Sequence, residues 1–204
     1  MRYFTSDWHL FHQNSIKFDS RPFRDLDHMH SVLINNYNSC VKPNDVCFFL
    51  GDIGWGQNGA IAAIIQSLNG TKILISGNHD RGDGAMMSIG FAAVLRTASI
   101  EISKQIVTLS HCPLRGVYRE NTKDMRGAAP GDNWHGEGRH KNISVEDKGQ
   151  YHLHGHIHSN PSKLDGAPTI QGRQWDVGVP GNKYRPVSES QIASWIAKGK
   201  PDAV

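Results

Sequence analysis

The first part of the chain alternates short apolar runs with segments of helical periodicity. The runs Arg2 to Ser6, Val46 to Leu50 and Ile73 to Ile75 are rich in β-branched and aromatic residues and predict buried strands. Between them, apolar residues at helical spacing predict helices over Asp25 to Tyr37 and from Asn58 or Gly59 to Leu68. This β-α-β-α-β order predicts a sheet of parallel strands joined by right-handed crossovers.

From residue 91 the pattern changes to strands without long helices. Ala92 to Thr97, Ser99 to Ile102 and Gln105 to Ser110 predict hairpins in a second sheet or at its edge. Trp175 to Val179 predicts a final core strand, and Ser188 to Gln191 has the sequence of a capping box. The last helix should therefore begin directly after Ser188.

Length and composition favour a single α/β domain over residues 1 to 204, because no linker, repeat or low-complexity tract divides the chain. The chain has 22 Lys and Arg against 19 Asp and Glu, and its net charge of +3 is too small to indicate a protein that coats nucleic acid. Three cysteines without a Cys-x-x-Cys pair argue against disulfides and a thiolate zinc site. Because the chain also lacks a signal-peptide core and an apolar run of ~18 residues, we expect a cytoplasmic protein without a membrane span.

Side chains that can bind metal ions follow the predicted strands. The carboxyl ends of parallel strands meet at one edge of a sheet, so these side chains are expected to converge there. Tyr151 to His158 alternates histidine strictly, which by itself also fits an adventitious metal-binding edge, but Gly155 permits a close turn that could aim two histidines into a common site. Oxygen and imidazole ligands in this number suffice for two metals that share a carboxylate. The candidates are Asp7, His9, Asp52, Asn78, His79, His111, His156 and His158.

Other polar residues allow either a functional or a structural interpretation. His12 could face the substrate or be a plain loop residue, whereas His28 and His30 on the first predicted helix are expected to face solvent. The segment 115 to 148 is polar and glycine-rich, and a loop of that length is usually functional or disordered. It could be a flap that covers the substrate or a mobile surface loop. Its basic residues include Arg115, Arg126 and Arg139.

Five short segments together resemble the motifs of the calcineurin-like metallophosphoesterases, in that family's usual order, over residues 7 to 158. The resemblance implies a four-layer αββα sandwich of mixed sheets with two metal ions at the strand ends. The segments are Asp7-x-His9, Gly51-Asp52, Gly77-Asn78-His79-Asp80, His111 within Ser110-His111-Cys112-Pro113, and Gly155-His156-Ile157-His158.

The resemblance also implies a role for each motif residue. Asp52 would bridge two divalent ions, with Mn²⁺ expected first and Fe, Zn, Ni or Co as alternatives. A metal-bound hydroxide would attack the phosphorus of a phosphate ester, and His79 would donate a proton to the leaving oxygen. His12, Arg115, Arg126 and Arg139 are the candidates for substrate binding. One ion would be held by Asp7, His9, Asp52 and His158, and the other by Asp52, Asn78, His111 and His156.

The chain departs from the family after Gly51-Asp52. Trp55 and Gly56 occupy the places of an Asp and an Arg in the protein-phosphatase branch, which leaves Asp80 as the candidate that orients His79. Without that arginine the site lacks a clamp suited to a dianionic monoester, which favours phosphodiesters, with nucleotides or nucleic acid among the substrates. A phosphomonoesterase is the alternative, and a non-catalytic metal-binding scaffold is a third reading. The sequence leaves the substrate, the native metals and the oligomeric state open.

Overall fold

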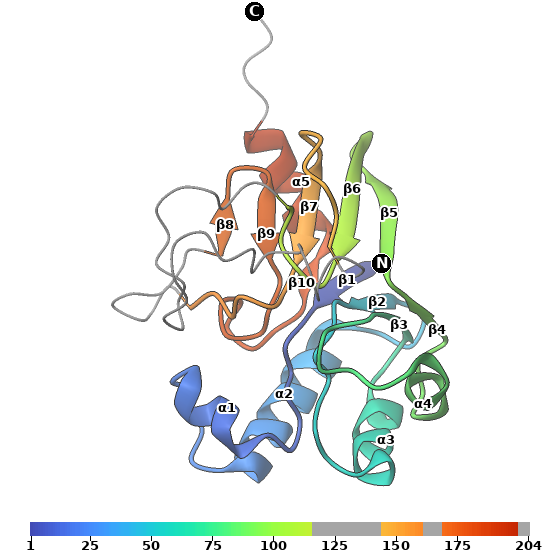
Figure 1. Cartoon of the computed structure of the whole chain (residues 1–204), viewed down its shortest axis with the longest axis vertical. Coiled ribbons are helices and arrows are strands. Elements are labelled where there is room, and N and C mark those ends of the chain that lie inside the picture. The colour runs from blue at the N-terminus through green and yellow to red at the C-terminus, as the bar shows by residue number, and fades with distance from the viewer. Residues whose placement is uncertain (116–143, 161–168, 200–204) are drawn as a thin grey trace, which may run out of the picture.

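A computed structural model describes residues 1–115, 144–160 and 169–199 of the chain. Within these residues, two mixed sheets of five strands each and five helices form an α/β fold (Figure 1). None of the described helices combines the length and the apolar character needed to cross a membrane.

The first sheet is built mainly from parallel strands, as the sequence predicts. β1 pairs in parallel with β2, β2 with β3, and β3 with β4, while β10 runs antiparallel to β1 at the edge. Two points differ from the prediction. β4 joins this sheet instead of forming a hairpin with the next strand, and the two-residue β10 was too short to be recognised from its pattern. In spatial order the strands are β10 (Val187–Ser188), β1 (Arg2–Thr5), β2 (Val46–Phe49), β3 (Thr71–Ile75) and β4 (Ala93–Leu95).

The second sheet combines an antiparallel hairpin with parallel strands. The predicted hairpin turns at Ser103 and Lys104, which both have positive φ, as a two-residue hairpin turn requires. β6 and β7 pair in parallel, as do β7 and β9. The predicted core strand at 175–179 is shorter than expected. In spatial order the strands are β5 (Thr97–Ile102), β6 (Gln105–Ser110), β7 (Tyr151–His154), β9 (Gln174–Asp176) and β8 (Ile170–Gln171).

Residues of β2 alternate between two hydrophobic cores. Cys47 and Phe49 pack against helices α1 to α4 on one face of the first sheet, whereas Phe48 and Leu50 face the second sheet. Both faces of the strand are therefore buried, which explains its continuous apolar sequence. Figure 1 shows these four helices gathered on the side of the first sheet away from the second. The helices are α1 (Gln13–Phe18), α2 (Leu26–Cys40), α3 (Asn58–Ser67) and α4 (Asp83–Ser88).

The last helix, α5 (Glu189–Lys198), packs Ile192 and Ile196 into the core between the sheets. Its N-cap is Ser188, whose side chain accepts the backbone N–H of Gln191. The Gln191 side chain in turn accepts the backbone N–H of Ser188, which completes the predicted capping box. The described residues thus establish two mixed sheets with helices covering the first. They do not establish a separate helical layer over the second sheet, so the expected four-layer arrangement is not confirmed.

The prediction that His30 faces solvent is wrong. His30 is buried, and its Nε2 accepts the backbone N–H of Phe11 at 3.0 Å. The histidine therefore ties α2 to the segment after β1, a contact that helical periodicity cannot reveal because the residue is polar. The six-residue helices α1 and α4 were likewise missed, since each is too short to display a period.

We expect the core against α1 to α4 to contribute most to stability. Phe49 is fully buried there, so Phe49→Ala should lower the free energy of unfolding by about 3 to 5 kcal/mol. The matched control is Phe18→Ala, because the Phe18 side chain is 70% exposed and should change that free energy by less than about 0.5 kcal/mol. Urea unfolding of the two variants measures the difference, and equal losses would contradict this account of the core.

Candidate metal centre

Five of the seven candidate ligands have a left-handed backbone conformation. This conformation is strained for residues other than glycine and usually persists only where the surrounding structure imposes it, often at functional sites. Here it turns the chain away from each strand end, so that side chains from separate strands meet. The φ values are 56° for Asp7, 50° for His9, 55° for Asp52, 72° for His156 and 49° for His158.

One group of ligands lies where β1, β2 and β7 end. Its four ligand atoms, one each from Asp7, His9, Asp52 and His158, all lie within 4.8 Å of one another. His9 Nε2 is 3.0 Å from His158 Nε2 and 3.6 Å from Asp52 Oδ2. His158 Nε2 is 3.3 Å from Asp7 Oδ1. The sequence named these four residues as the ligands of one metal.

A second group lies beside the first. His111 Nε2 is 2.9 Å from Asn78 Oδ1, 3.2 Å from His156 Nδ1 and 3.5 Å from Asp52 Oδ1. His156 Nδ1 is in turn 2.9 Å from Asn78 Oδ1. Asp52 thus presents Oδ2 to the first group and Oδ1 to the second, which is one way in which a carboxylate bridges two cations.

The chemistry of these donor atoms fits divalent cations. His111 Nδ1 donates to the Leu50 carbonyl at 2.7 Å, so in the neutral ring Nε2 carries a lone pair. Nε2 faces the oxygens of Asn78 and Asp52, which are acceptors. Burial lowers the pKa of His111, but Asp52, Asp7 and Asp80 outweigh it and raise this pKa, so a proton on Nε2 lies between these atoms when no cation does. Acceptors facing acceptors in a buried site repel one another unless a positive charge lies between them. The two groups could therefore hold one divalent ion each.

The pKa shifts in the first ligand group also indicate that its buried carboxylates require positive charge nearby. Burial lowers the pKa of His158, but the carboxylates of Asp7 and Asp19 outweigh it and raise this pKa to about 10. Burial would raise the pKa of Asp7, yet His158 and the other imidazoles hold it below its usual range. Burial raises the pKa of Asp52 to about 6, with Asp7 and Asp80 adding to the effect and His111 opposing it. Protonated His158 therefore balances the negative charge of the Asp7 carboxylate, as a bound metal ion would.

Asp19 and Arg21, which the sequence analysis did not single out, support the first group. Asp19 Oδ1 accepts a hydrogen bond from His158 Nδ1 at 2.8 Å, which leaves Nε2 facing the other ligands. Arg21 is buried and donates to Asp19 Oδ2 and to the carbonyls of Asp7 and Trp8. The two residues lie in a turn, and the only signal in the sequence is an acidic and a basic residue two positions apart.

Close backbone approach explains two of the motif glycines. A Cβ atom at Gly155 would collide with Ser6 Oγ and Asp7 Oδ2, and one at Gly51, where φ is 94°, would lie 2.5 Å from His111 Nδ1. The close turn expected at Gly155 has its left-handed residue at His156. No larger side chain fits at position 155, because the end of β7 packs directly against the residues that follow β1.

Asp80 holds loops together. Its carboxylate accepts the backbone N–H groups of Asp52, Ile53 and Gly77 at 2.8 to 3.0 Å, which joins the loop after β2 to the loop after β3. These contacts make Asp80 a positioning residue for Asp52. His79 donates its own N–H to Asp52 Oδ1 at 3.0 Å.

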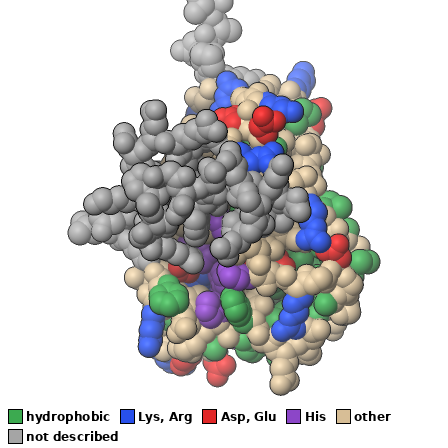
Figure 2. Space-filling model, in the orientation of Figure 1, with side chains coloured by type: hydrophobic (Ala, Val, Ile, Leu, Met, Phe, Trp, Pro, Cys, Tyr) green, Lys and Arg blue, Asp and Glu red, His purple; other side chains and the backbone are tan. Residues whose placement is uncertain are grey.

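The rings at the edge of the centre include two expected site residues. The exposed His79 ring packs beside Trp55, with centroids 4.8 Å apart, and lies 6.1 Å from the His9 ring. The His12 ring lies 5.5 Å from that of His9, so His12 borders the first group. Figure 2 shows histidine side chains gathered on one face of the molecule.

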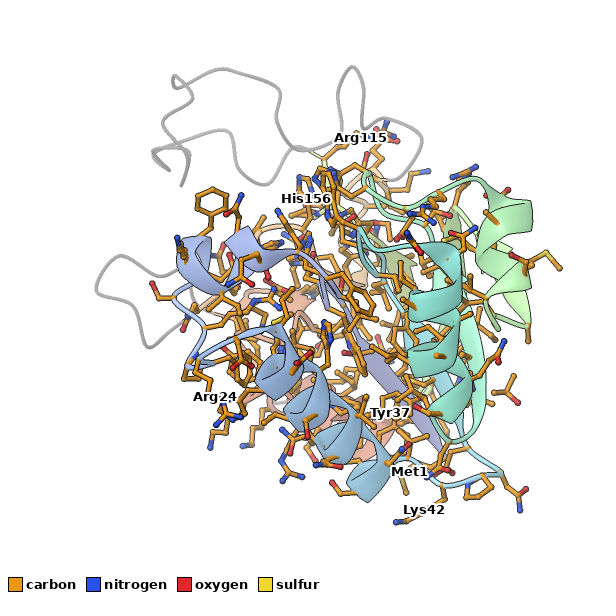
Figure 3. All side chains as sticks on the ribbon, turned by 90° about the horizontal axis from the view of Figure 1, so that it is seen from below. Met1, Arg24, Tyr37, Lys42, Arg115 and His156 are labelled. Atoms are coloured by element: carbon orange, nitrogen blue, oxygen red, sulfur yellow. The ribbon has the colours of Figure 1, made fainter. Side chains whose placement is uncertain are left out.

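The expected basic residues are only partly described. Arg115 pairs through its backbone with Glu146, and Figure 3 shows Arg115 and His156 at the same end of the molecule, away from Met1 and Lys42. Arg126 and Arg139 lie outside the described residues, as does most of the predicted 115–148 loop.

Two histidines of the alternating run, His152 and His154, do not join the centre. Both are buried within β7. His152 contacts Thr108 Oγ1 at 2.8 Å and Ser110 Oγ at 3.1 Å, and burial lowers its pKa to about 3. Burial also lowers the pKa of His154. Both are therefore core histidines, and only the part of the run after Gly155 reaches the centre.

Comparisons with known proteins identify relatives along the whole chain. The chain is 31% identical over 202 residues to the uncharacterised protein MJ1445 of Methanocaldococcus jannaschii, covering 97% of this chain and 92% of that protein. It is also 31% identical over 184 residues to the Gene 66 protein of Mycobacterium phage L5, covering 87% and 85% of the two chains. No protein-family model matches the chain.

Solved structures with a related fold include the protein of unknown function AQ665 from Aquifex aeolicus. That crystal structure superposes with a TM-score of 0.67 and 27% identity, covering 96% of this chain and 98% of the other. A phosphoesterase from E. coli, Yfce, aligns with a TM-score of 0.40 and 15% identity, covering 87% of this chain and 77% of that chain. A TM-score this low supports no conclusion about the fold or the function of the present chain.

We expect Asp19 to set the affinity of the first group for metal. Asp19→Asn keeps the shape of the side chain but removes the charge that orients His158, and should weaken Mn²⁺ binding there by about 10- to 100-fold. Calorimetric titration of the metal-free protein measures this affinity. Asp27→Asn, at an exposed position of α2, is the matched control and should bind Mn²⁺ as the wild type does. Unchanged affinity in Asp19→Asn would show that His158 needs no orienting carboxylate.

Proposed function

The chain belongs to the family of MJ1445 and the Gene 66 protein, and we propose that it is a metal-dependent phosphoesterase with a dinuclear centre. The observation that carries the proposal is the pair of ligand groups that share Asp52. Oxygen and imidazole ligands around a bridging carboxylate suit two divalent ions, and such paired ions are a common means of phosphate-ester hydrolysis.

The charges of the two ligand groups, once metal ions are bound, favour binding of an anion. When bound, two divalent ions would polarise the P–O bonds and lower the pKa of a bound water. Asp7 and Asp52 supply two negative charges against four positive ones, so the loaded centre is net positive and attracts a phosphate group. Arg21 and Asp80 fix the loops that carry these carboxylates, so little reorganisation is needed when the substrate binds.

His79 is suited to act as the proton donor. Its backbone N–H binds Asp52, while its ring lies outside the ligand groups and is exposed at their edge. A substrate oxygen that leaves from this side can therefore take a proton from the imidazole as the P–O bond breaks. The ring donates the proton, and Asp52 keeps the residue in place.

Phosphodiesters are the substrates that we favour, and nucleotide esters are included among them. Gly56 stands where a guanidinium would clamp a second phosphate charge, so a diester, with one charge, fits this site better. Arg81 favours the alternative of a phosphomonoesterase, because its Nη2 donates to the Gly56 carbonyl at 2.5 Å. A guanidinium therefore lies close to the place where the sequence lacks one.

Rates on simple esters test the proposed activity. After reconstitution with Mn²⁺, the protein should hydrolyse bis-p-nitrophenyl phosphate faster than p-nitrophenyl phosphate. Asp52→Asn should lose both metals and the activity, because a neutral amide bridges cations poorly. The matched control is Asp45→Asn, since Asp45 binds the N-terminus, remote from the centre.

Elemental analysis of the same variants gives the metal content. Two equivalents in the wild type and in Asp45→Asn, with none in Asp52→Asn, is the expected result. Both metals retained in Asp52→Asn would remove Asp52 from the bridge. A faster reaction with p-nitrophenyl phosphate would favour the monoesterase, and a metal-loaded protein inactive on all esters would favour a scaffold.

His79→Ala should separate good from poor leaving groups. An alkoxide needs a proton to leave, so the variant should lose about 10²- to 10⁴-fold in kcat on a dinucleoside monophosphate. On bis-p-nitrophenyl phosphate the loss should be much smaller, because p-nitrophenolate leaves without a proton. His28→Ala, on α2, is the control and should retain both activities. If His79→Ala loses both activities equally at full metal content, His79 positions the phosphate and is not the general acid.

A further inference from the structure

We propose that Trp55 and His12 form a subsite that stacks a planar aromatic group of the ester, such as a nucleobase, and this proposal rests on the phosphoesterase function. The Trp55 ring contacts two imidazole rings, with centroid distances of 4.9 Å to His12 and 4.8 Å to His79. Its side chain remains 50% exposed. The three rings form one surface at the edge of the metal centre.

The loop that carries Trp55 is fixed, so the exposure of the ring is not a sign of a loose segment. The Trp55 N–H donates to the Leu10 carbonyl at 2.9 Å, and Gly54 pairs with Leu10 in a β-bridge. On the other side, Arg81 binds the Gly56 carbonyl, and a Cβ at Gly56 would lie 2.6 Å from Phe11 Cδ2. Because these contacts fix the backbone on both sides of Trp55, only the side-chain torsions of the indole remain to be ordered when a ligand stacks on it.

The subsite lies next to the reacting atoms. His9, a ligand of the first group, has its ring 5.5 Å from that of His12 and 6.1 Å from that of His79. A phosphate bound at the metals would therefore bring its ester substituent to Trp55. His79 links the subsite to the departing oxygen, so the planar group belongs on the leaving side of the ester.

The location of Trp55 separates it from other exposed apolar residues. Met87 and Ile106 are also more than half exposed, and single exposed apolar side chains are common on protein surfaces. Neither has an aromatic ring, whereas Trp55 is a half-exposed aromatic residue that contacts His79, the proposed proton donor. Aromatic faces bind nucleobases of any identity, so the structure points to a class of substituent and not to a particular base.

Binding of nucleotides compared with base-free sugar phosphates tests the subsite. The probes are thymidine 5′- and 3′-monophosphate and the corresponding 2-deoxyribose phosphates, titrated into the Mn²⁺-loaded protein. The ratio of their dissociation constants isolates the contribution of the base. For at least one of the two pairs, the wild type should bind the nucleotide about tenfold or more tightly than the base-free compound.

Three substitutions at Trp55 separate stacking from bulk. Trp55→Ala and Trp55→Leu should remove the preference for the nucleotide, and Trp55→Phe should keep most of it because Phe retains an aromatic face. The nucleotide should also quench indole fluorescence in the wild type, and the part of this quenching that comes from Trp55 should be missing in Trp55→Phe. Ile106→Ala is the control, since Ile106 lies at the end of β6 opposite His111.

Several results would contradict the proposed subsite. Equal affinity of the wild type for nucleotides and base-free compounds would do so, as would a preference that survives in Trp55→Leu. A fall in kcat on all esters with an unchanged binding ratio would mean that Trp55 only supports His79. Because the binding ratio needs no turnover, a protein without esterase activity could still have the subsite, and an active esterase could lack it.

Discussion

The buried carboxylates of Asp7 and Asp52 dominate the electrostatics of this protein. Both lie at the ends of strands, almost without solvent, with imidazole rings on several sides. Such charges are tolerated in a protein interior only when hydrogen bonds and positive charge surround them. The left-handed turns and the close glycine contacts serve this requirement, because they let imidazole rings and the backbone N–H of His156 approach the carboxylates. Buried Arg21 supports them indirectly, because it binds the Asp7 carbonyl and the carboxylate of Asp19, the partner of His158.

The supporting residues explain how a centre assembled from separate strand ends keeps its shape. Asp80 joins the loops after β2 and β3 through backbone N–H groups, and Arg21 joins the turn before α2 to the end of β1. The same turn carries Asp19, whose carboxylate accepts a hydrogen bond from His158. Asp80, Arg21 and Asp19 thus hold the candidate ligands through atoms that do not face the metals, and these contacts leave the metal-facing atoms available to cations.

Much of this arrangement could be predicted from the sequence, because periodicity and strand-end motifs report on local structure. The parallel β1-β2-β3 unit and the capping box at Ser188 follow from such patterns, and so does the convergence of Asp52 with the histidines. The missed features depend on partners far along the chain. Asp19 finds His158 139 positions away, and His30 is buried by Phe11, so neither residue carries a local signal of its role.

The division of the centre between the two sheets couples metal supply to the integrity of the fold. Asp7, Asp52 and Asn78 follow strands of the first sheet, whereas His111, His156 and His158 follow strands of the second. An apolar core also packs between the two sheets. Cations bound between ligands of both sheets would link the sheets directly, and the free energy of binding them would add to the stability of the fold. A cell that starves this protein of metal would then loosen the scaffold together with the chemistry.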